Sequence, residues 1–241
     1  MTPLHDRLSA MTSRAARPGT AGVLLVALAV LAGCGGDDTP KPSPEKTLAA
    51  AKGNLDTTSG VRIGLSTRKL PTGVNGLLEA DGIGTHDPAF EGDIKVSAGG
   101  ITADAAVVAV DGVVHAKLPF RTTFVPIEPG DYGAPDPAAL MSTDGGLSSL
   151  LTSATDVEAG KEVRDGSAVL TSYTGTVPGR AVAQVIPSAS ATEDFDATFT
   201  VDDEQKLAKA VLTGPFYPRA EDVTYTITFK AYGTEKDIKA P

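Results

Sequence analysis

The chain has 241 residues, of which 41% are hydrophobic and 5% aromatic, and its formal net charge at pH 7 is -9. A chain this acidic lacks the general basic field that attracts nucleic acid or anionic headgroups, so we expect it to bind no nucleic acid. Its single cysteine, Cys34, excludes a disulfide within the chain, and burial of apolar side chains must therefore hold the fold together.

Residues 1–33 have the layout of a secretory signal. An unbroken apolar run at 22–32 follows three arginines, Arg7, Arg14 and Arg17. A positive segment, an apolar segment and small residues at the end are typical of a signal that is cleaved. The apolar run is shorter than the roughly 20 residues that a helix needs to cross a bilayer.

The tetrapeptide Leu31-Ala32-Gly33-Cys34 resembles the bacterial lipobox. It predicts cleavage after Gly33 and attachment of acyl chains at Cys34, which anchor the protein to the extracytoplasmic face of the cell membrane, in the cell envelope. The alternative, an ordinary secretory signal, would leave an exported chain with an unpaired thiol. Cleavage would leave 208 residues and, by removing three arginines and Asp6, would change the formal charge from -9 to -11.

Residues 34–43 are rich in glycine, proline and charge, which predicts a flexible tether ahead of a folded domain at 44–241. The domain is expected to begin with a helix, because Ser43 is a suitable N-cap and Pro44 suits the first turn. One stripe of this short amphipathic helix carries Leu48, Ala51, Lys52 and Leu55.

From Val61 the period of the sequence changes to two. Val61, Ile63 and Leu65 alternate with polar or small residues, which predicts a strand with one buried face. The same pattern recurs around Leu78 and Ala80, at 90–96, at 101–110 and at 113–118. The dipeptides Gly99-Gly100 and Asp111-Gly112 suit tight hairpin turns, so these segments are expected to form an antiparallel meander.

Residues 119–137 contain five prolines and predict a long loop, a kind of segment that is often functional in compact domains. Asp136 is expected to cap a helical turn at 137–140, and a second turn is expected at 147–151. Further strands are predicted at 155–163, 169–175, 195–201, 207–212 and 223–232, with a short helix at 180–186.

These elements predict an α+β fold: a single large curved antiparallel β-sheet, a half-open barrel, with short helices on its concave face. The interior would be lined by small aliphatic residues and would lack the bulky aromatics that usually fill such a space. An unfilled apolar interior suits a lipid tail.

No pattern of catalytic residues is found. The chain contains no Gly-x-Ser-x-Gly elbow, no glycine-rich phosphate loop and no cysteine–histidine cluster for a metal. Asp202-Asp203-Glu204 lacks the spaced ligands of a calcium loop and suits a hairpin tip. His115 shares its strand face with Lys117, which indicates a solvated face. We therefore expect no catalytic residue, no metal, no cofactor and no enzymatic activity.

Across the mature chain, the order of several segments resembles the LppX/LprAFG family of actinobacterial lipoproteins. Besides the lipobox and the tether, the segments are Gly92–Val96, Gly99–Ala105, Val107–Ala116, Tyr132–Pro137, 145–151, Tyr173–Gly175, 181–187 and Gln205–Leu207. The resemblance implies a half-barrel similar to that of the LolA and LolB lipoprotein carriers, with helices inside and a hydrophobic cavity. It also implies binding of acylated lipids or glycolipids, their transfer across the envelope, and work with a membrane lipid exporter.

Alternation along three neighbouring strands selects the residues expected to line the cavity: Ile94, Val96, Ile101, Ala103, Ala105, Val107, Val114, Ala116 and Leu118. Inward aliphatic residues on a sheet are also what an ordinary filled core requires. The alternative function is therefore a structural or interaction lipoprotein that docks an envelope partner through the loop at 119–137.

Overall fold

The computed structural model describes residues 42–241, so the predicted signal, Cys34 and most of the predicted tether lie outside the described residues. Lys41–Pro241 is a compact unit that contains the whole described sheet, its helices and its core. Because this unit has its own hydrophobic core, we expect it to fold without the residues that precede it.

Helix α1 (Pro44–Thr57) begins where the sequence predicts. The Ser43 hydroxyl accepts a hydrogen bond from the backbone N–H of Lys46, and Pro44 stands in the first turn. The helix buries Leu48, Ala51 and Leu55 along one face. Its amphipathic stripe thus fixes which side packs on the sheet.

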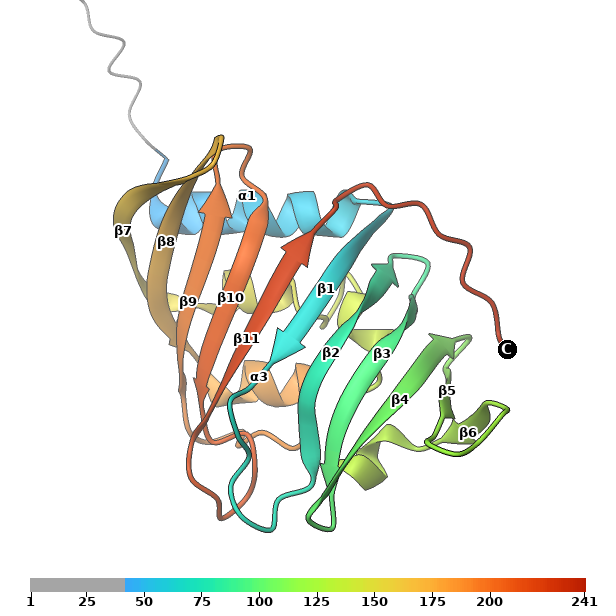
Figure 1. The fold of residues 1–241 in the computed structure, drawn as a ribbon. Helices are drawn as coiled ribbons and strands as arrows, with labels where there is room; N and C mark the ends of the chain where they lie inside the picture. Colours follow the sequence, from blue (N-terminus) through green and yellow to red (C-terminus); the bar gives the residue numbers. More distant parts are fainter. Residues whose placement is uncertain (1–41) are drawn as a thin grey trace, which may run out of the picture. The chain divides into compact units, whose positions relative to one another are not determined.

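The strands of the described chain form one antiparallel sheet (Figure 1). They are β1 (Gly60–Ser66), β2 (Gly76–Thr85), β3 (Ala89–Ala98), β4 (Ile101–Val110), β5 (Val113–Lys117), β6 (Val125–Ile127), β7 (Thr155–Asp165), β8 (Ala168–Val177), β9 (Phe195–Asp202), β10 (Leu207–Gly214) and β11 (Val223–Lys230). Their order is β6-β5-β4-β3-β2-β1-β11-β10-β9-β8-β7. Two meanders of consecutive strands therefore meet where β1 pairs with β11, for example at Ile63 and Phe229.

The sheet stays open between its edge strands β6 and β7, as predicted, and few helices accompany it. These are α1, α2 (Ser149–Ser153), α3 (Gly179–Val185) and two 3-10 turns, η1 (Pro129–Tyr132) and η2 (Ala139–Met141). One prediction needs correction, because the proline-rich segment at 119–137 is not all loop. Strand β6 lies within it and pairs with β5, and Pro126 is tolerated there because β6 is an edge strand.

The helices fill one half of the concave side. Leu48 of α1, Leu150 of α2 and Val182 of α3 belong to the same buried cluster as strands β8–β11. Aromatic rings complete this half, with Phe216 in edge contact with Phe195 at 4.9 Å and with Tyr225 at 5.0 Å between ring centroids. The half formed by β2–β6 has no helix of more than one turn on it and faces residues 129–147 instead.

The residues after β11 cross the outer face of the sheet. The backbone N–H of Gly233 donates to the carbonyl of Gly60 at 3.0 Å, and Lys236 forms an ion pair with Glu91 at 3.0 Å. Ile238 is buried in a small cluster with Ala89 and Val108. This C-terminal strap therefore covers the convex side of β3 and β4, opposite the helices.

Candidate functional site

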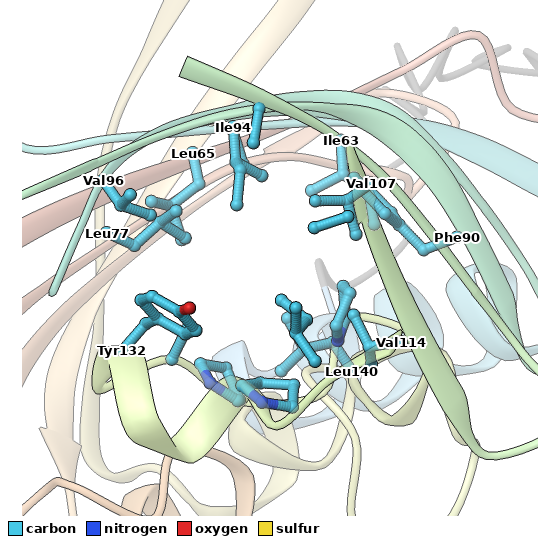
Figure 2. Close-up of a pocket in the computed structure, with 18 of the residues that line it drawn as sticks. Ile63, Leu65, Leu77, Phe90, Ile94, Val96, Val107, Val114, Tyr132 and Leu140 are labelled. Carbon is cyan, nitrogen blue, oxygen red and sulfur yellow. The ribbon is translucent and has the colours of Figure 1, made fainter. Parts of the chain in front are cut away.

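A cavity lies between the β1–β6 half of the sheet and the segment that follows β6. We call its two sides the sheet wall, formed by residues of β1–β6, Leu118 and Ile227, and the loop wall, formed by residues 129–147. Figure 2 shows both walls with their side chains directed toward the space between them. The cavity has a volume of about 90 Å³. It is therefore a narrow slot in this structure, and a bulky occupant would have to push the walls apart.

Small side chains on neighbouring strands hollow out the sheet wall. Ala80 of β2, Ala105 of β4 and Ala116 of β5 all face the cavity. Seven of the nine residues that alternation selected lie on this wall: Ile94, Val96, Ala105, Val107, Val114, Ala116 and Leu118. Period-two alternation identifies them because β3, β4 and β5 pair in regular register.

The other two selected residues lie outside the cavity wall. Ile101 and Ala103 have the same parity as Ala105 on β4, but they stand nearer the hairpin that joins β3 to β4. Ile101 is 71% exposed. Alternation gives the face on which a side chain lies, and it does not show how far along the strand the opposite wall extends.

A β-bulge in strand β2 brings a further residue into the cavity. The register between β2 and β3 shifts between Leu77 and Glu79, so that Leu77 pairs with Val96 and Ala80 pairs with Ile94. Both Leu77 and Ala80 then line the cavity, whereas regular alternation predicts that Leu78 shares the face of Ala80. No signal in the sequence around Gly76 marks this bulge.

The ring of Phe90 lies over two glycines of the sheet wall. A Cβ built on Gly82 would come within 2.4 Å of the Phe90 Cζ, and one on Gly92 within 2.9 Å. Gly82 and Gly92 are direct partners across β2 and β3. Because both lack side chains, the ring lies close to the sheet at one end of the cavity (Figure 2).

Prolines and short turns shape the loop wall. Pro129, Pro135 and Pro137 line the cavity together with Leu140 and Leu147. Asp136 accepts a hydrogen bond from the backbone N–H of Ala138 at 2.9 Å, but the helical turn η2 begins at Ala139, two residues later than the turn expected at 137–140. The backbone N–H of Leu147 donates to the Leu140 carbonyl at 3.0 Å. This wall is held mainly by local turns rather than by a strand ladder.

The loop wall also comes close to strand β2 and to the residue that precedes it, at two glycines. Gly133 has a φ of 66°, and a Cβ there would lie 2.7 Å from the Asn75 carbonyl oxygen. Met141 of η2 occupies the space above Gly84, where a Cβ would lie 2.6 Å from its Cγ. The segment at 119–137, expected to be a loop, thus contributes to the cavity. The sequence could not show which of its residues face the cavity, because the segment has no periodic pattern of apolar residues.

The side chains that line the cavity are almost all hydrocarbon. Tyr132 is the one lining residue in the described chain whose side chain carries an oxygen or nitrogen atom. The residues 42–241 contain no cluster of three or more His, Cys, Asp or Glu that could hold a metal, and no helix among them is long and apolar enough to cross a membrane. Such a site binds by removing apolar surface from water.

Comparison with known proteins agrees with this architecture. The family model described as LppX_LprAFG lipoprotein matches residues 43–239. The lipoarabinomannan carrier proteins LprG of Mycobacterium bovis and Mycobacterium tuberculosis are each 26% identical to the chain over 230 residues, covering 90% of this chain and 91% of theirs.

Two solved structures share the fold. The structure of LprF from Mycobacterium bovis matches with a TM-score of 0.65 at 15% identity, over 83% of this chain and 98% of that one. The structure of lipoprotein LppX from Mycobacterium tuberculosis matches with a TM-score of 0.60 at 14% identity, over 83% of this chain and 100% of that one.

Proposed function

The chain belongs to the LppX_LprAFG lipoprotein family, and on that premise we propose that it binds acylated lipids or glycolipids in the cavity between the sheet wall and the loop wall, and helps to transfer them across the cell envelope. The observation that carries this proposal is the lining: of the side chains around the cavity, that of Tyr132 alone is polar. The LprG relatives are named as carriers of lipoarabinomannan, which supports a carrier role.

Burial of acyl chains supplies the binding free energy. Each methylene group moved from water into an apolar environment contributes about 0.8 kcal/mol, and apolar area contributes roughly 25 cal/mol per Å². This term does not depend on the position of double bonds or branches, so selectivity for the tails is expected to be loose. All nine residues selected by alternation remain part of the proposed binding surface: seven line the cavity, and Ile101 and Ala103 lie beyond it, toward the hairpin between β3 and β4.

We further propose that the carrier is held at the membrane by acyl chains on Cys34, on the extracytoplasmic face, after removal of residues 1–33. Residues 34–43 then form the tether and 44–241 the lipid-binding domain. Two or three acyl chains anchor far more firmly than one. Transfer to or from a membrane lipid exporter fits this location.

Transfer by this protein is proposed to be non-enzymatic. Lipid would enter and leave by partition between the cavity and a membrane, with no bond made or broken. This is consistent with a lining in which Tyr132 carries the single titratable side chain.

Native mass spectrometry with lipid extraction tests the proposal on the unit that begins at Lys41, expressed in a bacterium and purified without detergent. Co-purified acylated lipid in stoichiometric amount is the expected result. A lipid-free protein that also refuses added phospholipid and triacylglycerol would overturn it. That outcome would favour the docking alternative, for which the fully exposed side chain of Phe120 in the segment 119–137 is the supporting observation.

A further inference from the structure

The two ends of the cavity differ in their exposure to solvent. Along the cavity face of β4, exposure rises from 2% at Val107 and 7% at Ala105 to 71% at Ile101. Phe90 and Val114 are also buried at the Val107 end. One end is therefore closed inside the protein, and the other leads toward the hairpin between β3 and β4.

Tyr132 lies at the end that leads to solvent. Figure 2 shows it across the cavity from Leu77 and Val96, with Phe90, Val107 and Val114 at the far end. Val96 is paired with Ala103, the residue between Ala105 and Ile101 on that face of β4. In Figure 2 the phenol oxygen of Tyr132 is directed into the cavity, and it makes no hydrogen bond with any residue from 42 to 241.

An unpaired hydroxyl sets Tyr132 apart from Tyr217, Tyr225 and Tyr232. The hydroxyls of Tyr217 and Tyr225 lie 2.7 Å apart, and Tyr225 donates to the Leu77 carbonyl at 2.8 Å. The Tyr232 hydroxyl donates to the Leu207 carbonyl at 2.8 Å. Buried tyrosines generally find such a partner. Tyr132 is only half-buried, and its hydroxyl is directed into the cavity, where water or a bound ligand can provide one.

We propose that the Tyr132 hydroxyl donates a hydrogen bond to an acceptor oxygen at the junction between the acyl chains and the headgroup of the bound lipid. This oxygen is either the carbonyl of an acyl ester or an oxygen of the headgroup. The hydrogen bond would fix the direction of binding: the chains extend toward Phe90 and Val107, and the headgroup leaves past Ile101. The inference rests on the proposed function and adds to it the orientation of the ligand.

A purely apolar slot would accept an acyl chain in either direction, because the hydrophobic effect has no directional preference. A few polar groups in an apolar pocket are what normally fix a ligand's orientation. A hydroxyl that donates in surroundings of low dielectric forms a stronger hydrogen bond than it would in water. Tyr132 thus acts as a specificity-determining residue.

The test compares Tyr132→Phe with the wild type and with Tyr173→Phe, a control on β8 outside the cavity. Each delipidated protein, beginning at Lys41, is titrated with three probes: a diacyl phosphatidylglycerol, its dialkyl ether counterpart with the same chains, and a long-chain alkylpyrene that contains no oxygen. A dissociation constant is measured for each protein with each probe. Removal of one hydrogen bond is expected to weaken binding by roughly two- to tenfold.

If the acceptor is the ester carbonyl, the wild type prefers the diacyl lipid, and Tyr132→Phe abolishes that preference while its affinity for alkylpyrene is unchanged. If the acceptor is a headgroup oxygen, Tyr132→Phe weakens the binding of both phospholipids by the same factor and again leaves the affinity for alkylpyrene unchanged. The proposal is overturned if Tyr132→Phe behaves like Tyr173→Phe, or if it weakens alkylpyrene as much as the phospholipids. A wild type that binds none of the three would instead overturn the proposed function itself.

Discussion

The side-chain hydroxyl of Tyr225 on β11 donates a hydrogen bond of 2.8 Å to the main-chain carbonyl of Leu77, the residue at which β2 is bulged. A bulge interrupts the ladder of backbone hydrogen bonds, so a carbonyl at this point needs another donor. Tyr217 holds the Tyr225 hydroxyl in place from 2.7 Å away. The core thus stabilises the irregularity that turns Leu77 into the cavity.

Tyr225→Phe is expected to lower the free energy of unfolding by about 1–3 kcal/mol, because it leaves the Leu77 carbonyl without its donor. Denaturant unfolding measures the change. Tyr173→Phe serves as the control, since Tyr173 makes no hydrogen bond through its hydroxyl within residues 42–241. A loss in Tyr225→Phe no larger than that in Tyr173→Phe would show that the bulge does not depend on this bond.

Stability is expected to fall at alkaline pH. Burial raises the pKa of Tyr217, Tyr225 and Tyr232 above the ordinary tyrosine value of 10.0. A raised pKa means that the unfolded chain loses these protons first, so their contribution is complete below pH 10.0 and is lost as the pH rises above it. Each such tyrosine lowers the free energy of unfolding by up to about 1.4 kcal/mol per pH unit.

Guanidinium unfolding at several pH values on either side of the ordinary tyrosine pKa, with Tyr232→Phe for comparison, measures this dependence. The variant is expected to show a shallower decline, because it lacks one of the three groups. A stability that does not change across that range would contradict the assignment of these tyrosines as buried and protonated.

Gly82→Ala is expected to destabilise the protein by about 1–3 kcal/mol, because its Cβ has no room. That atom would lie 2.4 Å from Phe90 Cζ and 2.6 Å from the Glu91 carbonyl oxygen. A displaced Phe90 ring would also enter the cavity and weaken lipid binding. Thermal unfolding and a lipid-binding titration test the two effects separately.

Gly53→Ala is the matched control for that substitution. Gly53 lies inside α1, and a Cβ there would meet no atom within 4 Å. Because alanine favours a helix interior over glycine, this variant should gain about 0.5–1 kcal/mol. Equal effects in the two variants would show that packing against Phe90 is not the cause of the loss at Gly82.

Ala105→Phe and Ala106→Phe form a second matched pair, on adjacent positions that face opposite sides of β4. Ala105 lines the cavity, whereas Ala106 faces the outer side. A ring at 105 would occupy part of the narrow slot and is expected to weaken lipid binding roughly tenfold, equivalent to about 1.4 kcal/mol. A ring at 106 should leave binding unchanged. Both are compared by titration with the same phospholipid, and equal affinities would place the lipid elsewhere.

The strands and the first helix could be predicted from the sequence because their signals are local. Ser43 caps α1 as expected, and alternation from Val61 onward gives the correct buried face for β3, β4 and β5. The same rule failed at Leu78, where a bulge changes the parity of one strand. A bulge depends on partners such as Tyr225, which lies far away in the sequence.

The loop wall illustrates the other limit of prediction. Prolines indicated an irregular segment, and this is largely what the structure contains. Which of its residues face the sheet depends on close approaches such as that of Met141 to Gly84. The position where this wall ends also decides that Ile101 is exposed while Ala105 is not, and no periodicity encodes that boundary.

The pairing of β1 with β11 has a consequence for the order of events during folding. Each meander consists of neighbouring hairpins and can form from contacts that are near in sequence, but the ladder that joins Arg62 to Lys230 links opposite ends of the domain. Such non-local pairing is slow, because closing a large loop costs conformational entropy before the stabilising contacts between the strands can form. Ile227 of β11 is also part of the sheet wall. The cavity therefore stays incomplete until β11, the last strand, has paired with β1, and a chain truncated before β11 would leave the apolar sheet wall exposed to solvent and prone to aggregation.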